Sequence, residues 1–340
     1  MFALFFLPSR HGQRRIVGGR LATLAIAAGL VGYGAMSSNL GAIDTLGTVF
    51  MYLVVTQAWN ILGGYGGYLN FGMVTYFGIG AYASAVLFQY FGLSPFLTAP
   101  LAGAAAALFG LLIGIPTLRL RGAYFAVITI IITFAVQLLM LDLPFTQGAL
   151  GIFLSPLAAN PVFVERLFYF IFFALAATAT TLVFAVENSN FGWALVAIRE
   201  DEDAAEVIGV RTTAVKWTAN ALAAFMTGTV GGIYAQRILY IEPTGTFALD
   251  ISLNVVLMAV IGGAGTWQGP VIGVPLVLLV AEALRVTVTS EVNRVIFSII
   301  VILIALFVPG GIMGLLQEVR RRMRPLVRKS AGETMPRTGG

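Results

Sequence analysis

The feature of this sequence that most constrains its fold is the length of its stretches without charge. Between Asp44 and Arg119 lie 74 consecutive residues that include no Asp, Glu, Lys or Arg. A helix needs roughly 20 apolar residues to cross the hydrocarbon core of a bilayer, so this stretch can hold about three helices. Its residues are continuously apolar and do not alternate with polar ones, which excludes the strands of a membrane β-barrel. The sequence therefore predicts an all-α polytopic membrane protein.

The uncharged stretches and the turn signals between them predict about ten membrane spans, with about eight as the lower limit. Three patterns rich in small residues, at 78–85, 101–114 and 228–235, suit close contacts between helices. The expected spans are residues 18–37, 43–62, 69–91, 96–118, 123–142, 163–186, 215–236, 250–263, 269–289 and 293–310.

The basic residues predict how these spans are oriented. Of the 20 Lys and Arg residues, four lie between Arg10 and Arg20 and seven follow position 319. Basic residues that flank spans favour the cytoplasm. If the N-terminal arm (residues 1–17) lies inside, alternation puts three more basic elements of the chain on the same side: the loop with Arg119 and Arg121, the loop 187–214 and the tail 319–340. The loops around residues 44, 142–165 and 242–250 then lie outside.

This topology divides the chain into the arm, a transmembrane domain over residues 18–318, and a basic tail that we expect to be disordered. The alternative role for the two basic clusters is binding to RNA or to anionic lipid.

Two glycine-rich interruptions separate consecutive spans, NILGGYGGYLNFG at 60–72 and GGAGTWQGP at 262–270. Both contain two glycines, a spacer, a glycine, a spacer and an aromatic residue. The stretch 251–289 must be split at the second interruption for the basic tail to lie inside, and the alternative is a re-entrant or broken helix. Broken helices at corresponding positions point to a transport pathway, whereas close helix packing is the simpler role of glycine.

Uncharged polar residues within the spans need partners, which either a water-filled pathway or another helix can supply. These residues are Gln57, Asn60, Asn70, Thr129, Thr133, Gln137, Asn220 and Asn254. Combined with the glycine-rich interruptions, they give the candidate pathway residues: Asn60, Gly63, Gly64, Gly66, Gly67, Asn70, Thr129, Thr133, Gln137, Gly262, Gly263 and Gly265.

Enzyme chemistry has little support in this sequence. There is no cysteine, and the single histidine, His11, lies in the N-terminal arm, so we expect no catalytic residue and no metal site. The chain has no G-x-x-x-x-G-K-[ST] motif and therefore no P-loop for ATP. A carboxylate near the middle of the membrane, typical of an ion-coupled carrier, is missing from 45–118. Glu282 and Arg285 lie one helical turn apart within a span and can form an ion pair. This pair either has a function in transport or only neutralises its own charges.

Charge is concentrated in one cytoplasmic loop. Six of the eight residues from Arg199 to Glu206 are charged. Residues 193–208 place Leu195, Ile198, Glu202, Ala205 and Ile208 on one helical stripe. Asn188, Ser189 and Asn190 precede this segment as possible caps, and Gly209 ends it as a C-terminal cap would. A short helix with an apolar edge and a charged face suits the groove of a soluble partner protein, and a solvated connector is the alternative.

Several stretches in the same order resemble the permease subunits of ABC importers for branched-chain amino acids, in particular the LivM-like branch. The resemblance covers about residues 40–315. It rests on WNILGGYGGYLNFGMVTYFGIGAYASA (59–85), TLRLRGAYFAVITI (117–130), TQGALGI (146–152), NSNFGWALVAIREDEDAAEVIGV (188–210) and VIGGAGTWQGPVIGVPL (260–276).

The resemblance implies a bacterial inner-membrane importer that takes up branched-chain or related amino acids, and the charge pattern puts both termini of this chain in the cytoplasm. Its other parts would be a homologous second permease, two ATPase subunits that hold ATP and Mg²⁺, and a periplasmic binding protein. It also implies that Asp203-Ala204-Ala205 and Gly209 correspond to the loop that docks on the ATPase. We expect this docking to involve Arg199, Glu200, Glu202, Asp203, Ala204, Ala205, Glu206 and Gly209.

The sequence departs from the family pattern at three places. Asp203 stands where Glu is usual, and Gln147 and Ala149 interrupt a run that tends to be richer in glycine. Residues 69–77 carry Asn70, Met73 and Tyr76 where relatives often have a Ser-x-Gly-His-like stretch. If that stretch lines the pathway, urea, short amides or other small carboxylates are alternative cargoes. An ion-coupled secondary transporter is the alternative from another class.

Overall fold

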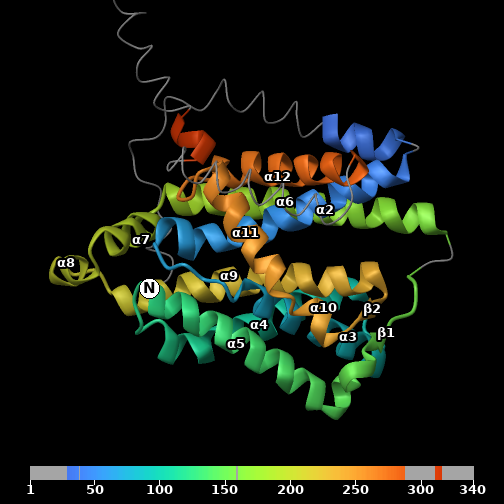
Figure 1. The fold of residues 1–340 in the computed structure, drawn as a ribbon, viewed down its shortest axis with the longest axis horizontal. Helices are drawn as coiled ribbons and strands as arrows, with labels where there is room; N and C mark the ends of the chain where they lie inside the picture. Colours follow the sequence, from blue (N-terminus) through green and yellow to red (C-terminus); the bar gives the residue numbers. More distant parts are fainter. Residues whose placement is uncertain (1–28, 38, 158–159, 288–310, 316–340) are drawn as a thin grey trace, which may run out of the picture.

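The computed structural model of the protein describes residues 29–37, 39–157, 160–287 and 311–315. They form a helical bundle with one small two-stranded pair (Figure 1). After a helical stretch at 29–36, the elements are α2 (Leu40–Trp59), the π-helix η2 (Asn60–Tyr65), α3 (Met73–Phe91), α4 (Pro95–Thr117), α5 (Ala123–Asp142), the 3-10 turns η3 (Pro144–Thr146) and η4 (Gly148–Leu150), β1 (Ile152–Phe153), α6 (Pro161–Glu187), α7 (Asn190–Glu200), α8 (Glu202–Val207), α9 (Thr212–Ile238), β2 (Tyr240–Ile241), α10 (Pro243–Thr246), α11 (Leu249–Gly262) and α12 (Gln268–Thr287).

Eight of the expected spans coincide with helices to within a few residues, from 43–62 (α2 and η2) to 269–289 (α12). Among the described residues, five helical stretches are long and apolar enough to cross a membrane: Leu40–Tyr65, Pro95–Thr117, Ala123–Asp142, Pro161–Glu187 and Pro243–Gly262. The expected span 293–310 lies outside the described residues, as do the arm 1–17 and the tail 319–340.

Helix α9 forms the centre of the bundle and packs most extensively against α3 and α4. Small residues make this possible, because a Cβ added to Gly80 on α3 would strike the backbone of Gly228 on α9. A Cβ on Gly103 of α4 would come within 2.8 Å of the Phe225 carbonyl oxygen. The three patterns of small residues at 78–85, 101–114 and 228–235 therefore serve close helix packing, as the sequence predicts.

The loops group at two opposite ends of the bundle, with α7 and α8 at one end and β1 and β2 at the other (Figure 1). At the first end, Arg121 pairs with Asp203. At the second end, Ile152 pairs with Ile241 in the strand register, and Arg237 contacts both Asp44 and Glu165. The loops that the charge pattern assigns to one side of the membrane thus lie together in each case.

The second glycine-rich interruption separates two helices, since α11 ends at Gly262 and α12 begins at Gln268. The helices cross closely there, because a Cβ on Gly262 would strike the carbonyl oxygen of Gly269. The first interruption is a π-helix over Asn60–Tyr65 followed by a non-helical segment that ends before Met73. The predicted split of 251–289 into two helices is therefore confirmed. At the first interruption, the helix extends to Tyr65, several residues beyond the predicted end at 62.

Candidate functional site

The charged loop predicted to be cytoplasmic folds into two short helices, α7 and α8. We call residues 187–211, which include these helices and the last residue of α6, the α7–α8 unit. Ser189 caps α7 by accepting a hydrogen bond from the backbone of Gly192 at 3.2 Å. Asp201 is extended and interrupts the helix (φ −160°, ψ 112°). Its carboxylate then caps α8 through the backbone N–H of Ala204 at 2.9 Å. The single helix expected over 193–208 is therefore wrong, because an aspartate in mid-segment starts a second helix.

The apolar stripe expected to meet a partner protein instead packs against the membrane domain of the chain itself. Leu195, Ile198 and Ala205 are all less than 5% exposed. Only Ile208, at 76%, remains open to solvent. The interpretation of this edge as a docking edge is wrong for the three buried residues, because burying them fixes α7 and α8 to the bundle.

The exposed tip of the unit lies at the end of α8. Val207 and Ile208 are 87% and 76% exposed. Gly209 follows with φ +92°, and Gly209 and Val210 donate backbone hydrogen bonds to Glu206 and Ala205. This pair of backbone hydrogen bonds is typical of a helix that ends at a glycine, as the sequence predicts for Gly209. A recess of about 300 Å³ lies beside the tip, lined by Glu206, Arg211, Thr212, Thr213, Ala214 and Trp217.

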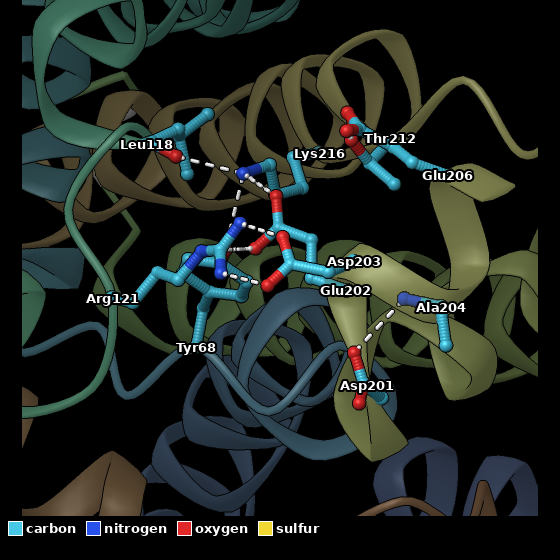
Figure 2. A network of polar contacts seen from close by, with 10 residues as sticks. All are labelled: Tyr68, Leu118, Arg121, Asp201, Glu202, Asp203, Ala204, Glu206, Thr212 and Lys216. Atoms are coloured by element: carbon cyan, nitrogen blue, oxygen red, sulfur yellow. Dashed lines mark hydrogen bonds and ion pairs between the residues drawn. The ribbon is translucent and has the colours of Figure 1, made fainter.

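A buried ion pair fixes α8 to the membrane helices (Figure 2). Glu202 meets Lys216 of α9 at 2.5 Å, and their side chains are 10% and 6% exposed. The Lys216 ammonium also donates to the Leu118 carbonyl oxygen at 2.8 Å and to the Tyr68 hydroxyl at 3.1 Å, so all three of its protons have acceptors. The Tyr68 hydroxyl in turn donates to Glu202 at 2.6 Å.

Arg121 extends this network to the surface. Its guanidinium binds Asp203 through two hydrogen bonds of 2.8 and 3.0 Å and contacts Glu202 at 3.1 Å. Burial alone would raise the pKa of Glu202, but hydrogen bonds from Lys216 and Tyr68 outweigh it and hold the pKa below its usual value. The hydrogen bonds from Arg121 lower the pKa of Asp203. Both carboxyl groups are therefore ionised at neutral pH.

The two glycine-rich interruptions meet directly. Asn60 accepts a hydrogen bond from the backbone N–H of Gly265 at 2.8 Å and donates to the Thr266 carbonyl oxygen at 2.9 Å. Gln57 donates to the Trp267 carbonyl oxygen at 2.8 Å. A Cβ on Gly64 would lie 2.5 Å from the Gly265 nitrogen. The glycines of the two segments therefore allow the backbones of the two interruptions to lie in direct contact with each other.

The α7–α8 unit touches this contact at two points. Arg199 donates to the Gly64 carbonyl oxygen at 3.2 Å. Glu187 accepts hydrogen bonds from the Tyr65 hydroxyl at 2.5 Å and from the Trp267 backbone at 3.0 Å. One carboxylate oxygen therefore links both glycine-rich segments. We call residues 60–72 the junction segment.

Of the remaining candidate pathway residues, Thr129 and Thr133 on α5 make buried contacts with other elements. Thr129 accepts a hydrogen bond from the Phe71 backbone at 3.1 Å, and the hydroxyls of Thr133 and Thr75 lie 2.8 Å apart. Asn70 is 1% exposed, and its carbonyl group accepts from the Gly72 backbone at 2.7 Å. Gln137 lies half-buried on α5, one turn after Thr133. Their role in a pathway stays a prediction.

Several residues of the site were missed by sequence reasoning: Tyr68, Glu187 and Lys216. Lys216 carried a usable signal, because a lysine at the start of a span needs either water or an anion. Glu187 and Tyr68 carried no such signal, since their partners are more than 70 residues away in the chain.

Glu282 is exposed on α12, and the side chain of Arg285 lies outside the described residues. Among the described residues, no group of His, Asp and Glu side chains is arranged to hold a metal ion.

Comparison with known proteins identifies the family. Residues 41–306 match the family model described as branched-chain amino acid transport system / permease component. The chain is 26% identical over 336 residues to the high-affinity branched-chain amino acid transport system permease protein LivM of Salmonella typhimurium and, equally, of Escherichia coli K12. Each alignment covers 91% of this chain and 78% of the relative. No solved structure matches significantly.

These relatives are transport permeases and not enzymes, which confirms the resemblance, the membrane-embedded all-α class and the non-enzymatic role expected from the sequence. Since the family model covers more than three quarters of the sequence, this chain belongs to the permease component family of branched-chain amino acid transport systems.

Proposed function

We propose that this chain is one of two homologous permeases in an ATP-driven importer of branched-chain or related amino acids. It forms part of the translocation pathway and takes its driving force from two separate ATPase subunits, which hold ATP and Mg²⁺. A periplasmic binding protein delivers the cargo. The α7–α8 end of the bundle, the N-terminal arm and the basic tail face the cytoplasm in this proposal, as the distribution of basic residues favours.

The observation that carries the proposal is the division of the α7–α8 unit into a fixed inner side and an open tip. Leu195, Ile198 and Ala205 are buried against the bundle. The open side presents Val207 and Ile208 beside a recess and several acidic residues. Exposed apolar side chains next to a recess, surrounded by charge, are typical of a surface that meets a soluble protein.

The contact set of this docking is smaller than the sequence suggests. We place Val207, Ile208, Glu200, Ala204 and Glu206 at the interface with the ATPase. Glu202 and Ala205 face inward instead and hold the unit in place. Asp203 is exposed but is already bound by Arg121, so it reaches the partner only together with that arginine.

The proposed cargo is supported by the family and not by a pocket. Both relatives are named for high-affinity transport of branched-chain amino acids. Asn70, Met73 and Tyr76, the unusual residues of 69–77, are buried at 1%, 1% and 7% exposure. The Asn70 side-chain oxygen accepts from the Gly72 backbone, and the Tyr76 hydroxyl donates to Asn220 on α9. This gives no reason to prefer urea or a short amide over a branched-chain amino acid.

Co-purification tests the docking proposal. The double variant Val207→Asp with Ile208→Asp should abolish recovery of the ATPase subunits with the tagged chain, because it puts two charges into an apolar contact. Leu150→Asp is the matched control, because Leu150 is 79% exposed at the opposite end of the bundle. The proposal is wrong if the wild-type chain recovers no ATPase, or if the double variant recovers it as well as the control does.

Competition of labelled leucine uptake by valine, isoleucine and urea then tests the cargo.

A further inference from the structure

Three charged side chains of the α7–α8 unit converge on one short stretch of the membrane domain. Glu187 binds the Tyr65 hydroxyl, Arg199 binds the Gly64 carbonyl oxygen, and Glu202 binds the Tyr68 hydroxyl. All three contacts fall within the junction segment, residues 60–72.

We propose that the junction segment receives the movement of the α7–α8 unit and that Tyr68 is the residue that positions it. This inference rests on the proposed function, since it needs a partner that moves the unit. Tyr68 holds both members of the buried pair, donating to Glu202 at 2.6 Å and accepting from Lys216 at 3.1 Å. A displacement of α8 therefore pulls on the Tyr68 side chain.

The surroundings of Tyr68 make it a firm attachment point for the α7–α8 unit. Its ring packs edge-on against Phe125 with centroids 5.2 Å apart, and the Lys216 ammonium lies 5.1 Å from the ring centre. The two preceding residues are glycines, and Gly67 has φ +74°, a conformation that other residues rarely adopt. The side chain is thus held by its ring, cation and hydrogen-bond contacts, and the positive φ of Gly67 sets the turn of the backbone before it.

The buried Glu202–Lys216 pair suits a positioning role better than a stabilising one. Taking two charges out of water costs about as much as their attraction returns, whereas the requirement for close contact fixes their geometry. The pair joins α8 to the start of α9, and the Leu118 carbonyl oxygen adds the end of α4.

The other end of the junction segment connects to the helices that would have to move. The Trp59 indole on α2 donates to the Asn70 carbonyl oxygen at 2.9 Å. The Phe71 backbone donates to Thr129 on α5 at 3.1 Å. Displacing the segment would therefore shift the end of α2 and the start of α5, where the candidate pathway residues lie.

Tyr68→Phe tests this role, because it removes only the hydroxyl. In the complete importer reconstituted in liposomes, we expect the ATPase subunits to assemble normally and to hydrolyse ATP. Leucine transported per ATP should fall roughly two- to thirtyfold, the range for residues that carry coupling. Tyr124→Phe, at a tyrosine that is 78% exposed, is the control and should match the wild type. Unchanged transport per ATP in Tyr68→Phe would overturn the proposal.

A distance measurement gives a readout that is independent of the cargo. The chain has no cysteine, so Leu69→Cys and Asn190→Cys, at two exposed positions, can carry spin labels without background. We expect the distance between the labels to stay constant on ATP binding in the otherwise wild-type importer and to change in Tyr68→Phe. The same response in both would contradict the inference.

A second variant keeps the test decisive if Tyr68→Phe does not fold. Glu202→Gln with Lys216→Met removes both charges together and leaves no lone buried ion, and it should uncouple the importer in the same way. If this variant assembles and couples like the wild type, Tyr68 and its ion pair are not the attachment. If no ATPase binds the wild-type chain, the proposed function fails instead.

Discussion

Asn60 and Gly265 are joined by a hydrogen bond of 2.8 Å, although 205 residues separate them in the chain. The same side-chain amide donates to the Thr266 carbonyl oxygen, so Asn60 satisfies one backbone donor and one backbone acceptor at a helix break. Broken helices leave such groups without partners inside a membrane protein, where water cannot replace them. Asn60 is fully buried, so this contact holds the two interruptions together.

Replacement of Asn60 by Ala should therefore destabilise the protein markedly. It leaves a buried N–H and a buried C=O unsatisfied, each at a cost of about 1–3 kcal/mol. Denaturant titration in mixed micelles measures the loss in free energy of unfolding. Asn188→Ala is the control, because that side chain is exposed and bonds only to its own helix, and its effect should stay below about 0.5 kcal/mol. Equal effects of the two variants would refute the role of Asn60.

Gly64→Ala should disturb the same contact by steric means. The added Cβ would lie 2.5 Å from the Gly265 nitrogen, and backbone cannot move away cheaply. We expect a loss of roughly 1–3 kcal/mol, the range for overpacking. Gly32→Ala provides the comparison, since nothing lies within 4 Å of its added Cβ and alanine favours a helix. A Gly64→Ala variant as stable as the Gly32→Ala variant would show that the interruptions do not touch.

Gly209→Ala should weaken ATPase binding through backbone strain alone. No atom lies within 4 Å of the added Cβ, but φ at Gly209 is +92°, which costs a residue with a side chain roughly 1–2 kcal/mol. The end of α8, with Val207 and Ile208, would then be less well ordered. Affinity for the purified ATPase should fall, and Gly209→Asn should restore part of it because asparagine tolerates positive φ better. Equal binding by the glycine, asparagine and alanine forms would contradict this prediction.

The Glu202 carboxylate should make the stability of the protein depend on pH in the acid range. The pKa of Glu202 is lowered in the folded protein from 4.5, so its contribution is present above about pH 4.5 and is lost as the pH falls through the lowered value. The melting temperature of the wild type should exceed that of Glu202→Gln at pH 7, and the difference should shrink below about pH 4.5. Glu200→Gln, at a side chain that is 71% exposed, should differ little from the wild type. A difference between wild type and Glu202→Gln that stays constant down to pH 3 would rule out this contribution.

Much of the architecture could be predicted from the sequence because the signals for it are local. The predicted span 123–142 has the same bounds as α5, because the length and hydropathy of this uncharged stretch determine where the helix begins and ends. The basic residues and the alternation of the spans predict that Arg121 and the loop 187–214 share a side, and the contact between Arg121 and Asp203 confirms it. The sequence likewise predicts Gly209 as a helix end, because the effect of a glycine at this position is confined to its own backbone.

The candidate site could be predicted only in part. Charge density predicts an exposed segment, and this holds for Glu200, Asp203 and Glu206 but not for Glu202. The apolar stripe predicts a partner contact for Leu195, Ile198 and Ala205, which instead pack against the chain itself. An apolar stripe shows that a helix has a side to bury, but it does not say which surface covers it. The break at Asp201 was also missed, because an aspartate can stand within a helix or cap the next one.

The sequence by itself determined that this chain crosses the membrane repeatedly as helices, which loops share a side, and which family it belongs to. Hydropathy, charge and short motifs act through neighbouring residues, so they can be seen without a fold. Only the tertiary structure decided that the two glycine-rich interruptions close on each other through Asn60, and that Tyr68 joins Glu202 and Lys216. These contacts join residues far apart in the chain, and each exists only because helix packing brings a donor within about 3 Å of its acceptor.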